Sequence, residues 1–205
     1  MTTNLPAEED RLDWLILMQH HGAPTRLLDW SESVLVGLFF AVCADLNEDG
    51  ELWSLFPQEL NVKAGLGPNF PLRTSKILIF LAGEPSHLNP LELAKELGLE
   101  PIPINPVAFY PTLGFMRMNS QLSTFTIHPN PVEGRSIIEL MPEQNNLRRF
   151  VIPAKAKKVI LDQLQTIGIS SRTLFQNLDS LSKDILREFS NPVRKLWGQP
   201  EIKTE

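Results

Sequence analysis

The chain has 205 residues, of which 42% are hydrophobic and 21% are charged, a composition typical of a soluble globular protein with one domain or one domain and a lobe. A net charge of −5 gives no reason to expect a nucleic acid or an anionic membrane as the partner, so we expect no direct DNA binding. The single cysteine, Cys43, excludes an internal disulfide, and its place in an apolar run predicts a buried, inert thiol.

The N-terminal residues are acidic and polar, without the basic start and apolar core of a signal peptide. The longest apolar run, 34–44, falls short of the about 20 residues that cross a bilayer. We therefore expect a cytoplasmic protein that does not enter a membrane. The domain organisation that we expect is a flexible leader over 1–7, one domain over 8–190 and a C-terminal tail over 191–205.

Two helices joined by an extended piece are predicted in the N-terminal quarter of the chain. Apolar residues at helical spacing predict the first helix over 8–19, and Gly22 with Pro24 ends it. Residues 25–30 form the extended piece, and a second helix over 33–45 is apolar on most sides, which predicts a central core helix. The N-terminus of this second helix could be capped by a capping box formed by Asp29 and Glu32, or instead by Ser31 or by Ser33.

Short elements and loops are predicted in the middle of the chain, where prolines concentrate. Alternating or proline-marked segments predict strands, and we expect the strand over 103–110 to lie at a sheet edge. The remaining segments are predicted to be loop-like or irregular, apart from a short helix ended by Gly98 and a run that is either a buried strand or a short helix. The strands are predicted over 51–56, 103–110, 124–128, 136–140 and 148–152, the loops over 57–75 and 114–123, and the short helix over 91–97. The run that is either a buried strand or a short helix covers 76–81.

Helices return in the C-terminal third. One is predicted over 154–167 with Ala156, Val159, Ile160 and Leu164 on its buried face, and another over 179–189. Strands in the middle with helices at both ends indicate an α+β fold with a small mixed or antiparallel sheet.

A dense polar stretch at 19–30, Gln-His-His-Gly-Ala-Pro-Thr-Arg-Leu-Leu-Asp-Trp, lies between the two N-terminal helices. With the Gly-Leu-Phe-Phe-Ala run at 37–41, it strongly resembles the core motif of the FRG domain family. The segments 117–128 and 174–179 are similar to later parts of the family pattern, so the resemblance covers about 8–189. It implies a bacterial, phage or mobile-element setting.

Two departures from the family pattern have consequences. The Phe-Arg-Gly or Tyr-Arg-Gly triplet that gives the family its name does not occur in this sequence. The resemblance therefore implies a shortened N-terminus or a segment supplied by another polypeptide. Ser31 stands where the family usually has threonine, which preserves a hydroxyl.

Arg26 and Asp29 are three positions apart, so in an extended segment they project to opposite faces and are poorly placed to pair with each other. We expect Arg26 to bind a carboxylate or a phosphate, and Asp29 to bind a helix N-terminus or Arg117. Two interpretations remain open: a buried ion-pair network that fixes the junction, or an Arg26 site for an anionic ligand such as a pyrophosphate.

The histidines do not predict a metal site. His20 and His21 are adjacent at a helix end and point about 100° apart, so they cannot easily bind one ion together. No second group of ligands has zinc spacing. One of the two histidines could face a cleft as an acid, a base or a hydrogen-bond donor, and Gln19 and Gln121 could present amides to a ligand or to backbone.

The order of motifs is similar to that in some ADP-ribosyltransferases, which implies a related fold and NAD as a candidate ligand, although no cofactor is identified. That comparison makes Gln121 and His21 the candidate catalytic residues. The alternative is a non-catalytic protein-interaction module of a bacterial or phage toxin or defence system, because the sequence has no Gly-x-Ser-x-Gly motif and no Walker-type loop. The candidate ligand-binding residues are Gln19, His20, Thr25, Arg26, Asp29 and Arg117.

Overall fold

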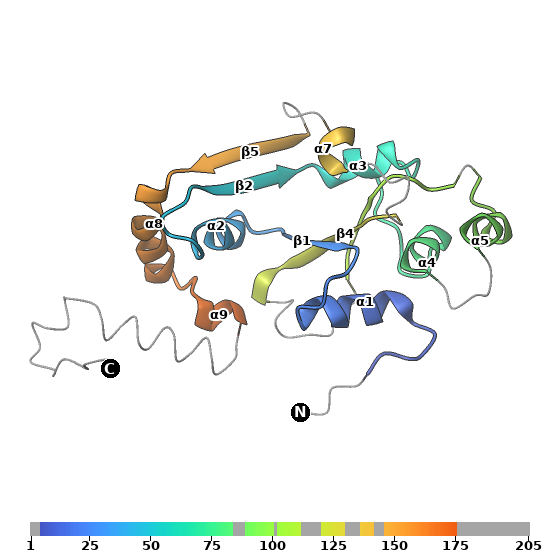
Figure 1. Cartoon of the computed structure of the whole chain (residues 1–205), viewed down its shortest axis with the longest axis horizontal. Helices are drawn as coiled ribbons and strands as arrows, with labels where there is room; N and C mark the ends of the chain where they lie inside the picture. The colour runs from blue at the N-terminus through green and yellow to red at the C-terminus, as the bar shows by residue number, and fades with distance from the viewer. Residues whose placement is uncertain are drawn as a thin grey trace, which may run out of the picture. The chain divides into compact units, whose positions relative to one another are not determined.

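The computed structural model describes residues 5–83, 89–100, 102–111, 120–129, 136–141 and 146–175. These residues fall into two compact units. The first unit takes its residues from 1–32, 51–114 and 122–150, and the second unit takes its residues from 33–50, 115–121 and 151–205. Helices and two small sheets alternate along the chain, which confirms the α+β class (Figure 1).

A three-stranded sheet lies in the first unit. Its strands are β1 (Leu27–Ser31), β4 (Ser123–Ile127) and β3 (Val107–Phe109), in the order β1-β4-β3, and both outer strands are antiparallel to β4. The register places Leu27 opposite Ile127. The structure confirms the predicted strand at 124–128, the extended piece at 25–30 and the edge position of the proline-marked strand.

Helices α1 (Arg11–His20) and α4 (Lys76–Ala82) of the first unit contact this sheet, and α5 (Pro90–Leu97) packs against α4. Helix α4 contacts α1, α5 and β4. The segment 76–81, for which the sequence left strand and helix open, is thus part of a helix. Neighbouring elements cover it on several sides and bury four of its residues: Ile77, Leu78, Phe80 and Leu81. Helix α5 ends at Gly98, which has a left-handed φ of 71°.

Two short helices correct the predictions for the middle of the chain. The segment predicted as a loop begins with α3 (Pro57–Lys63), where Pro57 occupies the first turn, the one place a helix tolerates it. The segment predicted as a strand at 136–140 is α7 (Ile137–Leu140). Ser136 and Glu139 form a capping box there, and this local pairing together with burial of both helix ends outweighs the β-branched composition.

The strands β2 (Gly50–Leu55) and β5 (Leu147–Ile152) form a second, two-stranded sheet, and both segments were predicted to be strands. Gly50 must be glycine because a Cβ atom there would lie 2.1 Å from the carbonyl oxygen of Ala41. The strand can begin at this point only with a residue that has no side chain.

The second unit contains α2 (Val34–Val42), α8 (Ala154–Thr166) and α9 (Ser171–Phe175), and α2 packs against α8. Of the candidate caps, Ser33 is the one that accepts a hydrogen bond from the first turn of α2. The prediction of a central core helix is wrong, because α2 buries Val36, Phe39 and Val42 but leaves three apolar side chains exposed.

Two further predictions for the second unit are corrected. The buried residues of α8 are Lys157, Leu161 and Leu164. Of the predicted face, Leu164 is buried and Ala156 and Ile160 are half-buried, whereas Val159 is exposed. Cys43 is exposed rather than buried, although partial desolvation of its thiol raises its pKa. The helix predicted over 179–189 and the tail over 191–205 lie outside the described residues, as does most of 114–123.

Candidate functional site

The polar motif occupies the turn between α1 and β1. Helix α1 ends in a Schellman arrangement, in which the Gly22 amide donates to the carbonyl of Gln19 and the Ala23 amide donates to that of Met18, each at 3.0 Å. Gly22 adopts a φ of +81°, which favours glycine. Pro24 follows where the chain leaves the helix. The Gly-x-Pro pattern thus folds the chain back toward the sheet.

Three side chains of the motif form a hydrogen-bonded cluster, which we name the Gln19 network. Thr25 Oγ1 donates to Gln19 Oε1 at 2.6 Å, and Gln19 Nε2 donates to Asp29 Oδ2 at 2.7 Å. The Leu27 amide donates to Thr25 Oγ1 at 3.1 Å. One glutamine amide therefore connects the end of α1 to the beginning of β1 through both of its polar atoms. The bond between Gln19 and Asp29 lies at the protein surface.

Arg26 points to a different partner. Its Nη1 atom donates to the carbonyl oxygen of Leu81 at 2.9 Å, at the C-terminal end of α4, where a positive charge is favourable for the helix dipole. Its own carbonyl accepts from the amide of His128 at 2.9 Å. Arg26 and Asp29 thus have separate partners, in agreement with their spacing. The partner of Arg26 is a carbonyl and that of Asp29 is a side-chain amide, while Arg117, the predicted arginine partner of Asp29, lies outside the described residues.

The histidines lie at the end of α1, where His20 is its last residue and His21 its C-cap. Their rings form an edge-to-face pair with centroids 5.2 Å apart. A third histidine, His128, follows β4, and desolvation lowers its pKa. Among the described residues, no group of three or more His, Cys, Asp or Glu side chains is placed to hold a metal ion.

The two motif segments include neighbouring strands, and Asp29 lies opposite Phe125 in the pairing of β1 with β4. Gln121 belongs to the second unit, and its Nε2 atom donates to the carbonyl of Leu174 at 3.2 Å. Arg117 lies outside the described residues. The structure therefore gathers the candidates from 19–29 in the first unit, while Gln121 has its contact in the second.

Asn61 is a polar residue that the sequence did not single out. It is fully buried in α3, and its side chain bonds both backbone groups of Ala108: Nδ2 donates to the carbonyl at 3.0 Å and Oδ1 accepts from the amide at 2.8 Å. Nδ2 also donates to the carbonyl of Asn69 at 3.0 Å. Because the two backbone groups of one strand residue point to the same side, the Asn61 amide occupies the outer edge of β3 where another strand would pair.

Lys157 was also missed, since a lysine in an amphipathic helix normally faces solvent. It is only 2% exposed, and its Nζ atom donates to the carbonyls of Ala44 at 3.0 Å and Asp45 at 3.1 Å. These carbonyls follow the end of α2, so the ammonium joins α8 to the chain that leaves that helix. No feature of the sequence around Lys157 indicates this pairing.

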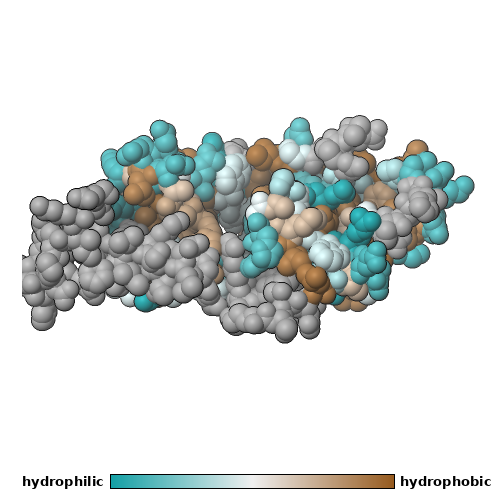
Figure 2. Space-filling model, turned by 60° about the horizontal axis from the view of Figure 1, so that its bottom comes forward, coloured by the Kyte–Doolittle hydropathy of each residue, from teal (hydrophilic) through white to brown (hydrophobic). Residues whose placement is uncertain are grey.

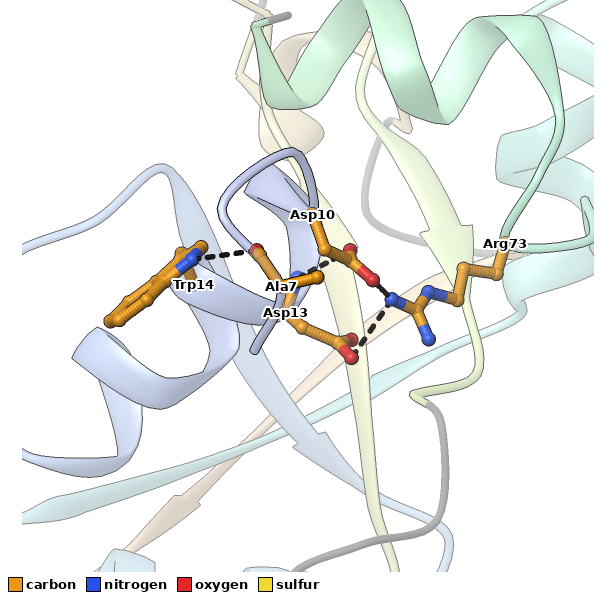
Figure 3. Close-up of polar contacts among 5 residues, drawn as sticks. All are labelled: Ala7, Asp10, Asp13, Trp14 and Arg73. Carbon is orange, nitrogen blue, oxygen red and sulfur yellow. Dashed lines mark hydrogen bonds and ion pairs between the residues drawn. The ribbon is translucent and has the colours of Figure 1, made fainter. Parts of the chain in front are cut away.

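A cluster of ion pairs and hydrogen bonds fixes the beginning of α1 (Figure 3). Arg73 forms an ion pair with Asp10 and another with Asp13, where the nitrogen and oxygen are 2.9 Å apart. Asp10 is also the N-cap of α1, since it accepts from the Asp13 amide. Just before the helix, the carbonyl of Ala7 accepts from Trp14 Nε1 at 3.0 Å. The cluster attaches the start of α1 to the segment that precedes α4.

The fold and this junction define an α+β protein whose most distinctive site is a helix–turn–strand held by a glutamine amide. A family model described as FRG domain matches residues 2–50, a segment that includes α1, β1 and α2, and so confirms the resemblance drawn from 19–30. No curated protein and no solved structure matches the chain significantly. Among the described residues, no helix is both long and apolar enough to span a bilayer.

Proposed function

We propose that the α1–β1 junction of this FRG-domain protein binds a nucleotide-like anionic ligand, with NAD as the leading candidate. One observation carries the proposal: the Gln19 network is held in place by its own hydrogen bonds and still reaches the surface, between Gln19 and Asp29. Polar groups that are already oriented lose little conformational entropy when a ligand arrives. A network that served only to stabilise the interior would gain nothing from exposure.

The side chains match the parts of such a ligand. A guanidinium has five N–H donors, and the carbonyl of Leu81 uses one donor of Arg26, which leaves capacity for a pyrophosphate. Asp29 has a second carboxylate oxygen to accept a hydrogen bond from a ribose hydroxyl, as acidic residues do in other dinucleotide sites. His20 supplies an imidazole donor beside the same turn. Thr25 positions Gln19 in this arrangement.

We extend the proposal to ADP-ribosyl transfer, with Gln121 and His21 as catalytic residues and Arg117 as a further ligand-binding residue. The support is the order of the motifs, which is an argument by analogy. Release of nicotinamide from NAD by the full chain is the direct assay. Gln121→Ala and His21→Ala should each abolish the release while NAD binding persists; if the purified chain releases no nicotinamide, the transferase proposal is wrong but the binding proposal stands.

Binding itself is tested by calorimetry on the full chain with NAD, ADP-ribose and ATP. The informative variant is Asp29→Asn, which keeps an oxygen to accept from Gln19 and removes the charge. We expect it to weaken NAD binding at least fivefold, and Arg26→Gln to weaken it more, whereas the exposed control Arg11→Gln should bind as the parent chain does. Absence of heat and of a thermal shift with all three ligands would refute the proposal.

A second candidate function, a non-catalytic protein-interaction module, is favoured by the exposed apolar side chains of α2. Val34, Leu35 and Phe40 are 67%, 39% and 42% exposed, and the described surface in Figure 2 shows apolar patches between hydrophilic ones. On this reading, Val34→Ser with Leu35→Ser would abolish partner binding in a pull-down without altering the melting temperature. The Arg26→Gln variant would then retain partner binding.

A further inference from the structure

We propose a second binding site in the first unit, formed by Glu32, Phe70 and Tyr110, that takes the guanidinium group of an arginine side chain from a basic peptide segment. The site lies beyond the α1–β1 junction and does not depend on the nucleotide proposal. Its three residues come from the chain after β1, the loop after α3 and the chain after β3.

Sheet topology brings Glu32 and Tyr110 together. The strands β1 and β3 are both antiparallel to β4, so they run parallel to each other and end at the same end of the sheet. Glu32 follows β1, and Tyr110 follows β3. The Tyr110 hydroxyl donates to Glu32 Oε1 at 2.7 Å, and the backbone amide of Glu32 donates to the carbonyl of Leu122 at 3.1 Å, which fixes the base of the site.

An aromatic pair forms the wall of the site. The rings of Phe70 and Tyr110 have centroids 4.7 Å apart at an angle of 57°. Phe70 is anchored, because it packs against the buried cluster that includes Leu60, Ala108 and Leu140. Tyr110 is 47% exposed although it is bonded at its hydroxyl and packed on one neighbour. An aromatic ring that is held in position and open to solvent is a suitable surface for a ligand.

The chemistry of the site selects a guanidinium. A carboxylate offers about four acceptor positions, and Tyr110 takes one of those on Glu32. A planar cation can donate to the remaining positions while it lies over the ring of Tyr110, where the cation–π attraction adds to the charge pairing. The net charge of −5 favours a basic partner at long range. An ammonium pairs only as a compact charge and has no plane to stack, so lysine should bind more weakly.

The experiment uses the fact that Tyr110 is the single tyrosine of the chain. Incorporation of 3-fluorotyrosine places one fluorine probe at this position in the full-length protein. Titration with the peptide acetyl-Gly-Arg-Gly-amide should give a saturable shift of its ¹⁹F resonance. The citrulline analogue, which has nearly the same shape without the charge, should bind at least fivefold more weakly, and the lysine analogue should lie between the two.

Variants locate the effect. Glu32→Gln keeps an acceptor for the tyrosine hydroxyl, and Glu32 is exposed, so the variant should fold; we expect it to weaken arginine-peptide binding at least fivefold and to leave NAD binding unchanged. The exposed control Glu48→Gln should bind as the parent does. Tyr110→Leu, which removes the aromatic ring, should weaken binding of the same peptide at least fivefold by calorimetry. The site is refuted if the citrulline peptide binds equally well, or if Glu32→Gln and Tyr110→Leu retain parental affinity.

Discussion

Replacement of Asn61 is the strongest test of how the first unit is held together. Its side chain makes three hydrogen bonds, two to the backbone of Ala108 and one to the carbonyl of Asn69, and it is fully buried. Asn61→Ala removes all three and leaves buried backbone groups without partners. Each orphaned group costs about 1–3 kcal/mol, partly offset where water enters the space left by the amide.

We therefore expect Asn61→Ala to lower the free energy of unfolding by about 3–5 kcal/mol, a large part of the about 5–15 kcal/mol that stabilises a typical domain. Urea denaturation followed by tryptophan fluorescence measures this as a shift of the midpoint. The matched control, Asn47→Ala, changes an exposed turn residue and should stay within about 0.5 kcal/mol of the parent.

The nearly isosteric variant Asn61→Asp separates hydrogen bonding from packing. It retains an oxygen for the amide of Ala108, but it loses both donors and places a carboxylate in a buried site. Its destabilisation should match or exceed that of Asn61→Ala at pH 8 and should decrease at pH 5, as the carboxyl group takes up a proton. If Asn61→Ala costs less than about 1 kcal/mol, the amide does not serve as the edge partner of β3.

Three other outcomes follow from the structure. Gly50→Ala should destabilise the chain by about 3 kcal/mol or more in the same urea assay, because the added Cβ atom would collide with the carbonyl of Ala41; a parental midpoint would contradict the 2.1 Å approach. Desolvation lowers the pKa of His128, so stability should be complete above its ordinary value of about 6.5 and fall as the pH drops below it; His128→Gln should flatten the pH profile of the melting temperature, and an unchanged slope would contradict this. The hydrogen bond to Glu32 raises the pKa of Tyr110, so absorbance at 295 nm, which reports tyrosinate, should titrate at lower pH in Glu32→Gln, and identical curves would exclude the bond.

The fold could be predicted where the hydrophobic period extended over several turns or where a glycine marked the end of an element. Helices α1 and α8 have more than two turns of pattern, and Gly98 marks the end of α5. Helices α3 and α7 were missed because seven and four residues are too few for a 3.6-residue period to show. The Ser136–Glu139 box was the one usable signal for α7, and its β-branched residues concealed it.

The candidate site was predictable in composition but not in pairing. Gln19, Thr25 and Asp29 were all identified from the motif, yet their mutual hydrogen bonds depend on a turn that reverses the chain. Arg26 meets the carbonyl of Leu81, which lies 55 positions away, and no local pattern encodes such a contact. The buried Lys157 contradicts the polarity rule on which surface assignments rest, so pattern alone could not place it.

Because the ammonium of Lys157 is buried, its chemical reactivity can report local opening of the second unit. Its neighbours on α8, Lys155 and Lys158, are exposed, whereas Lys157 is 2% exposed, so an amine-acylating reagent reaches the three at very different rates. When α8 separates from the end of α2 and closes again faster than the reagent reacts, the acylation rate of Lys157 divided by that of Lys155 or Lys158 equals the equilibrium constant for this opening. Mass spectrometry of one proteolytic peptide then measures the local stability of this helix pair without any substitution.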